Sequence, residues 1–263
     1  ACLLDPAVFA TRAGFTPDAW QARALRSTAS RMLLLASRQS GKSSTVALIA
    51  AHTALYEPGA LVLIVAPVER QSGETFRKVV GVFHALGWPV PSTSLGTMHL
   101  QLANGSRVIA LPGSGQTIRG YSGPRLLLLD EAAQIPDELL QAVFPMLSVS
   151  QGRLLALSTP FGMRGWFYDA WIGDATKPDA AAEATPWERY HVPASQCPRI
   201  TPAIIAEALR TFGPDYVASE YNCEFKPASG SLFNAAEMAA AVKEYEQPWN
   251  LSQYMPAWIS PSR

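Results

Sequence analysis

The sequence is poor in the side chains from which disulfide frameworks and zinc sites are built. Its 263 residues include three cysteines, Cys2, Cys197 and Cys223, and four scattered histidines. The number of cysteines is odd, and no two of them have the short spacing of a metal-binding pair. We therefore expect neither a disulfide framework nor a zinc centre.

The sequence also has few charged residues, no excess of cations and no long apolar run. Charged residues make up 16% of the chain and hydrophobic residues 48%, which is typical of a globular domain. No apolar run approaches the roughly 18 residues that a membrane-crossing helix needs, and the start of the chain lacks the features of a secretory signal. We expect a cytosolic protein without membrane contact.

The balance of charge argues against an isolated DNA-binding domain. Lys plus Arg and Asp plus Glu both total 21, so the net charge is zero, and the pI is about 7.1. Non-specific DNA binding needs cations that displace counterions from phosphates. A neutral chain that acts on DNA must concentrate its cations locally, pool them across subunits or take them from another domain.

Short apolar runs alternate with amphipathic stretches along most of the chain. The apolar runs are residues 31–36, 60–67, 125–130 and 153–159, and helical patterns occupy 42–55, 69–86 and 136–147. Strands that are apolar on both faces and alternate with helices indicate a mostly parallel sheet flanked by helices, an α/β fold. Segments 97–102 and 107–111 flank the turn-forming pair Asn104-Gly105 and predict an antiparallel hairpin.

The pattern changes near residue 173. Residues 173–186 are rich in small residues and contain proline, which predicts an exposed loop. Residues 187–193 predict an edge strand, and residues 201–212 and 215–221 predict two short helices. We expect a core domain at 1–186, a small helical lid at 187–227, and a linker or the start of a further domain at 228–263.

The clearest chemical motif lies between the first apolar run and the helix after it. Residues 36–43 read A-S-R-Q-S-G-K-S, a phosphate-binding loop with alanine at the usual first glycine. Lys42 should reach the β- and γ-phosphates, and Ser43 should help to hold Mg²⁺. Backbone N–H groups and the helix N-terminus should bind the remaining phosphate oxygens. The other residues of this cradle are Ser37, Arg38, Gln39, Ser40 and Gly41.

Two further motifs complete a predicted site for ATP and Mg²⁺. Asp130 and Glu131 stand at the carboxyl end of a predicted strand, where open α/β sheets bind ligands. Asp130 should contact Mg²⁺, whereas Glu131 should orient and deprotonate the attacking water, which favours hydrolysis. Trp20 and Gln21 precede the first strand and offer an aromatic ring and an amide that can pair with adenine.

The set of motifs resembles, in order, that of the large terminase subunits of tailed phages. The Arg-Gln pair inside the phosphate loop is the most discriminating feature, because ordinary phosphate loops place small residues there. The matching segments are Trp20-Gln21, residues 37–43, Val65-Ala66-Pro67, Ile118-Arg119-Gly120, Leu129-Asp130-Glu131-Ala132, Ser158-Thr159-Pro160 and Tyr221-Asn222-Cys223-Glu224-Phe225.

The resemblance implies a P-loop ATPase motor that drives double-stranded DNA into an empty capsid in the cytoplasm of the infected host. Its partners would be the portal protein, the small terminase subunit and further copies of the chain in a ring. Ser158 and Thr159 would sense the γ-phosphate or the attacking water. Arg38 would contact the γ-phosphate or signal to a neighbour, and Arg119 would act across a subunit boundary as an arginine finger, although which arginine acts in trans stays open.

The resemblance also implies a nuclease half in the full-length parent. Acidic residues stop after Glu246, so we expect no DNA cleavage from the residues present. Two other functions fit the same motifs. A helicase-like motor usually has a second motor-like domain, for which this chain has no room, and an assembly switch would bind ATP without useful turnover.

Overall fold

The computed structural model describes residues 2–112, 118, 120–173 and 187–227. The contacts group Ala1–Lys226 into one compact unit. Within the described residues, no helix combines the length and the apolar character needed to cross a membrane. Residues 174–186 of the predicted loop and the predicted linker at 228–263 lie outside the described residues.

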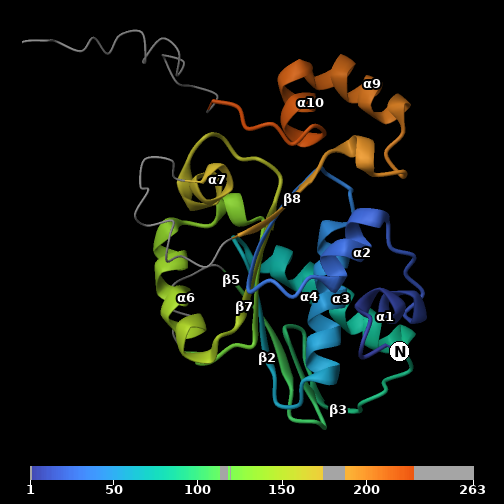
Figure 1. The fold of residues 1–263 in the computed structure, drawn as a ribbon, viewed down its shortest axis with the longest axis vertical. Helices are drawn as coiled ribbons and strands as arrows, with labels where there is room; N and C mark the ends of the chain where they lie inside the picture. The colour runs from blue at the N-terminus through green and yellow to red at the C-terminus, as the bar shows by residue number, and fades with distance from the viewer. Residues whose placement is uncertain (1, 113–117, 119, 174–186, 228–263) are drawn as a thin grey trace, which may run out of the picture. The chain divides into compact units, whose positions relative to one another are not determined.

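An eight-stranded sheet with the order β3-β4-β5-β2-β6-β7-β1-β8 forms the centre of this unit (Figure 1). Neighbouring strands from β5 to β8 are parallel, whereas β3, β4 and β5 pair in antiparallel fashion. This confirms the predicted α/β class with a mostly parallel sheet. The strands are β1 (Arg31–Ala36), β2 (Leu61–Ala66), β3 (Ser92–Leu95), β4 (His99–Leu102), β5 (Arg107–Pro112), β6 (Leu126–Asp130), β7 (Arg153–Ser158) and β8 (Glu188–Val192).

Helices cover both faces of the sheet (Figure 1). On one face lie α1 (Pro6–Arg12), α2 (Ala19–Arg26), α3 (Lys42–Tyr56) and α4 (Glu69–Ala85), and on the other lie α6 (Asp137–Ser150) and α7 (Gly165–Ile172). Met32 and Leu34 of β1 pack into the core beneath α3, whereas Leu33 and Leu35 pack into the core beneath α6. Because successive side chains of a strand point to opposite faces, the continuous apolar runs supply both cores.

The predicted antiparallel hairpin is confirmed. His99, Leu100 and Gln101 of β4 pair with β5, and Gly105 in the connecting turn has the left-handed φ of 84° that glycine tolerates. The pattern analysis missed β3, which adds a third antiparallel strand. All four of its residues are exposed, so no alternation of buried and exposed residues marks it in the sequence.

After β8 the chain forms a 3-10 turn, η2 (Ala194–Gln196), and two helices, α9 (Pro202–Phe212) and α10 (Pro214–Glu220). The edge strand and both helices were predicted. Backbone bonds tie β8 and α10 to the phosphate loop, because the N–H of Ser37 donates to the carbonyl oxygen of Val192, the last residue of β8, at 2.9 Å, and that of Arg38 donates to the carbonyl oxygen of Glu220 at 3.0 Å. A division between core and lid near residue 187 stays a prediction.

Gly152, which precedes β7, offers a test of this packing. A Cβ added there would lie 2.1 Å from the carbonyl oxygen of Pro124, a backbone atom. We expect Gly152→Ala to lower the melting temperature by several degrees, since overpacking costs about 1–3 kcal/mol. Gly81→Ala in α4 is the matched control, because an added Cβ there meets nothing within 4 Å and alanine favours a helix. Equal melting temperatures of the two variants in thermal unfolding would contradict the packing described here.

Candidate functional site

The parallel strands β1, β6 and β7 place polar residues at one edge of the sheet. Ser37 follows β1, Asp130 ends β6, and Ser158 ends β7. Leu35 pairs with Ser158 across the β1–β7 ladder, and Asp130 pairs with Leu157 across the β6–β7 ladder. The phosphate loop, the acidic pair and Ser158 therefore meet, as the positions of their strands predicted.

The phosphate loop makes a tight turn into α3. Gln39 and Gly41 both have left-handed backbones, with φ of 58° and 91°. The N–H of Arg38 donates to the carbonyl oxygen of Glu220 at 3.0 Å, and that of Ser40 donates to the carbonyl oxygen of Ser37 at 3.3 Å. Since these loop amides bind carbonyl groups of the protein, much of the positive potential available to an anion comes from the first turn of α3.

Lys42 and Glu131 neutralise each other across the site. The Lys42 Nζ lies 3.4 Å from the Glu131 Oε1, and the two side chains are 10% and 22% exposed. The Ser158 hydroxyl donates to the other carboxylate oxygen of Glu131 at 3.5 Å. Glu131 also has a left-handed backbone, φ 51°, which is uncommon for a residue with a side chain and is often found at functional sites.

Asp130 is a buried carboxylate held in one orientation. It is 4% exposed, the hydroxyl of Thr75 in α4 donates to its Oδ2 at 2.5 Å, and the N–H of Glu131 donates to its Oδ1 at 3.0 Å. Burial raises the pKa of Asp130 above its ordinary value, and the hydrogen bond from Thr75 opposes that shift. Ser43 lies half-buried in the first turn of α3. Oxygen ligands of this kind suit Mg²⁺.

Trp20 and Gln21 are buried, with 2% and 0% of their surfaces exposed. The Gln21 Oε1 accepts a hydrogen bond from the N–H of Asp18 at 2.8 Å as part of the cap of α2. Its Nε2 has no hydrogen-bond partner among the described residues, and it lies 2.7 Å from the position that a Cβ on Gly41 would occupy. Gln21 therefore contacts the phosphate loop, but only its N–H groups are left to contact a base.

Two arginines join the phosphate loop to other parts of the fold. The Arg38 Nε donates to the Glu220 Oε2 of α10 at 2.6 Å. Arg199, which sequence reasoning missed, donates to both carboxylate oxygens of Asp18 and to the carbonyl oxygen of Ser40. No motif marks Arg199, because its role depends on the folding of distant segments onto one another. The predicted arginine finger, Arg119, lies outside the described residues.

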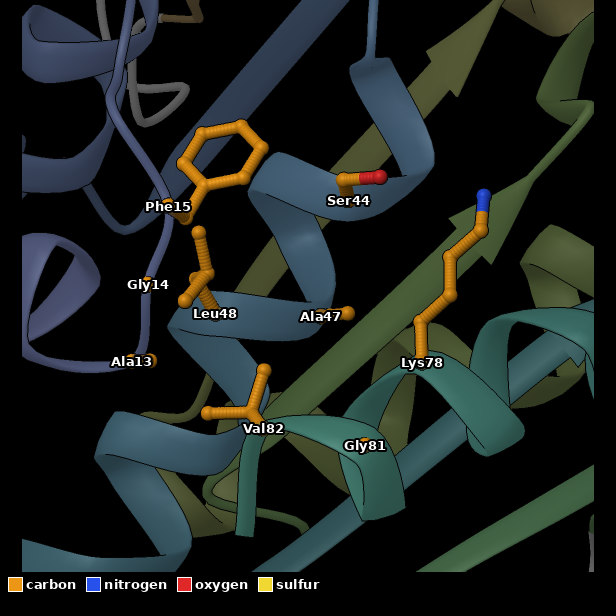
Figure 2. Close-up of a pocket in the computed structure, with 9 residues that line it drawn as sticks. All are labelled: Ala13, Gly14, Phe15, Ser44, Ala47, Leu48, Lys78, Gly81 and Val82. Atoms are coloured by element: carbon orange, nitrogen blue, oxygen red, sulfur yellow. The ribbon is translucent and has the colours of Figure 1, made fainter. Parts of the chain in front are cut away.

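A cavity of about 240 Å³ lies beside the N-terminal half of α3 (Figure 2). It begins at Ser44, the residue after Ser43, and Phe15, Leu48 and Val82 give it apolar walls, with Lys78 at its side. The other lining residues are Ala13, Gly14, Ala47 and Gly81. The cavity therefore lies between α3, α4 and the segment after α1, and none of the predicted site residues lines it.

Residues 33–240 match the family described as "Terminase large subunit, T4likevirus-type, N-terminal". The large terminase subunit of Thermus virus P23-45 is 29% identical to the chain over 253 residues, an alignment that covers 86% of this chain and 52% of that protein. The chain spans about half the length of the curated relatives it matches.

Two solved structures have the same fold. The ATPase domain of the Thermus phage P74-26 large terminase gives a TM-score of 0.71 at 24% identity, covering 83% of this chain and 98% of that one. The large terminase of a thermophilic bacteriophage, in complex with ADP, gives a TM-score of 0.60 at 10% identity, covering 78% of this chain and 52% of that one. The likeness confirms the P-loop NTPase fold.

The buried charge of Asp130 predicts an effect on stability. Because burial raises its pKa in the folded state, the ionised carboxylate is less favourable there than in the unfolded chain at neutral pH. Asp130→Asn keeps the shape and removes the charge, so we expect a melting temperature a few degrees higher at pH 7 without ligands. Asp169→Asn, at an exposed position of α7, should change nothing. A lower melting temperature for Asp130→Asn would show that the charge itself stabilises the fold.

Proposed function

Because the chain belongs to the family of terminase large subunits, we propose that it is the ATPase part of a phage DNA-packaging motor. It hydrolyses ATP with Mg²⁺ and uses the free energy to move double-stranded DNA. The observation that carries the proposal is the pairing of Lys42 with Glu131 at 3.4 Å, beside the buried Asp130 and at the end of a phosphate-binding loop. This constellation holds the charges that phosphoryl transfer to water requires.

The geometry of the site supports a division of roles. Lys42 gives its charge to the phosphates and thereby releases Glu131, whose carboxylate is then available to accept a proton from water beside the Ser158 hydroxyl. Asp130 and Ser43 fit Mg²⁺, because the buried carboxylate has two fixed oxygens and the cation nearest in the site, Lys42, is paired with Glu131. Mg²⁺ would neutralise charge on the phosphates.

Family membership supports the proposed setting and partners. They are double-stranded DNA, a portal protein, a small terminase subunit and a ring of identical subunits in the cytoplasm of the infected host. Arg38 is bound to Glu220 of its own chain, which favours a role within its own subunit. Arg119 is therefore the proposed trans-acting arginine. A nuclease activity belongs to the full-length parent in this proposal.

Substitutions of Lys42 and Glu131 test the proposal. Lys42→Ala should abolish ATP hydrolysis, because the phosphates lose the buried cation that neutralises them. Glu131→Gln should keep ATP binding and lower kcat by about 10²-fold or more, the usual scale for loss of a general base. Steady-state phosphate release and titration with a fluorescent ATP analogue measure the two properties.

Glu74→Gln is the matched control for these variants, because Glu74 is an exposed acid paired with Arg77 on the surface of α4. It should hydrolyse ATP as the parent does. A Glu131→Gln variant that binds ATP and hydrolyses it at the parent rate would favour the alternative of an ATP-dependent assembly switch.

Gln21→Met tests whether the Gln21 amide recognises the adenine base. Methionine keeps the length and burial of the side chain but loses the amide N–H groups that face the loop. If these groups pair with adenine, the ratio of kcat/KM for ATP to that for GTP should fall by roughly tenfold. The melting temperature without nucleotide measures the loss of the helix cap. An unchanged ratio would mean that Gln21 does not recognise the base.

A further inference from the structure

Arg199 connects three segments that are distant in the sequence. It lies between η2 and α9, and its two terminal nitrogens donate to the Asp18 Oδ1 at 3.1 Å and the Oδ2 at 2.5 Å. The Nη2 also donates to the carbonyl oxygen of Ser40 at 3.1 Å. The planar guanidinium thus binds both oxygens of one carboxylate and a backbone carbonyl group, an arrangement with fixed geometry.

Both partners of Arg199 stand next to the site. Asp18 caps α2, and its backbone N–H donates a hydrogen bond to the Gln21 Oε1. Ser40 directly precedes Gly41. A Cβ added to Gly41 would meet the Gln21 Nε2 at 2.7 Å and the Arg199 Nη2 at 3.5 Å. Arg199 and Gln21 therefore converge on the glycine at which α3 begins.

The two halves of the phosphate loop are held differently. In the first half, the N–H groups of Ser37 and Arg38 are bonded to backbone carbonyl groups at the end of β8 and at the end of α10. In the second half, the Ser40 hydroxyl has no hydrogen-bond partner among the described residues, and Gly41 has the left-handed φ of 91°. The side chain of Arg199 supplies the bond that holds the Ser40 carbonyl group from outside the loop.

We propose that Arg199 is a positioning residue for nucleotide binding, which holds Ser40 and Gly41 against Gln21 in the form that binds phosphates. The inference rests on the proposed binding of ATP. A loop that is already in its binding form pays no ordering cost when the ligand arrives, so Arg199 acts on affinity. The reacting groups Lys42, Asp130 and Glu131 make their contacts without it.

The exposure of Arg199 distinguishes a role in nucleotide binding from a role in the stability of the fold. Its side chain is 50% exposed, whereas that of Asp18 is 14% exposed. Ion pairs that are open to solvent add little to the free energy of unfolding. Loss of Arg199 should therefore affect nucleotide affinity far more than the melting temperature.

The test compares Arg199→Ala, Arg199→Lys and the parent by steady-state hydrolysis and by titration with a fluorescent ATP analogue. We expect KM and Kd for the nucleotide to rise about tenfold while kcat stays within about threefold, the pattern of lost binding without lost chemistry. Lysine keeps the charge but cannot hold two carboxylate oxygens and a carbonyl oxygen at once. Arg199→Lys should therefore resemble Arg199→Ala more than the parent.

Asp18→Asn tests the same contact from the other side, since asparagine keeps the cap of α2 and removes the charge that Arg199 binds. It should raise KM, and adding it to Arg199→Ala should raise KM little further, because both substitutions remove one interaction. Arg210→Ala is the matched control, an exposed arginine in the last turn of α9. It should leave KM unchanged.

Three results would overturn the inference. A parent-like KM for Arg199→Ala and Asp18→Asn, with hydrolysis still dependent on Lys42, would refute it and leave the proposed function intact. A fall in kcat at constant KM would assign Arg199 to the chemistry instead. A parent chain that neither binds nor hydrolyses ATP would refute the proposed function, and this inference with it.

Discussion

The burial of the Asp130 carboxylate at the end of β6 is the constraint on which the rest of the site depends. An ionised carboxylate away from water is costly unless donors meet its oxygens. Thr75 and the N–H of Glu131 meet them, and the bond from Thr75 requires α4 to pack against the sheet. The acid that should hold a metal and the acid that should activate water are thus fixed by one local arrangement.

The ion pair formed by Lys42 and Glu131 reduces the cost of burying two further charges. Both side chains are largely buried and lie 3.4 Å apart, so each lowers the cost of burying the other. The pairing compensates both charges within the site. In the proposed mechanism, an anion that attracts Lys42 weakens the pair and leaves the Glu131 carboxylate available as a base. The same two residues would then serve both the stability of the site and its proposed activity.

Local patterns determine the parts of this structure that could be predicted. The buried strands, the phosphate loop and Asp130-Glu131 follow from apolar runs and from the rule that carboxyl ends of parallel strands share an edge. Arg199 and Thr75 could not be predicted, because their partners are brought to them by tertiary packing. The pairing of Gln21 with adenine stays a prediction, and nothing in the local pattern signals that its oxygen is used to cap α2.

The contacts of the phosphate loop make the segment after β8 part of the phosphate site. The carbonyl groups of Val192 and Glu220 bind the first half of the loop, and Arg199 binds the second half. Because residues 192–220 bond both halves of the loop, a change in the shape of the loop requires a matching change in these residues or the loss of the hydrogen bonds. If the loop binds phosphate as proposed, a displacement of α9 and α10 relative to β1 should alter its affinity for phosphate, and by reciprocity bound phosphate should alter the preferred position of these helices.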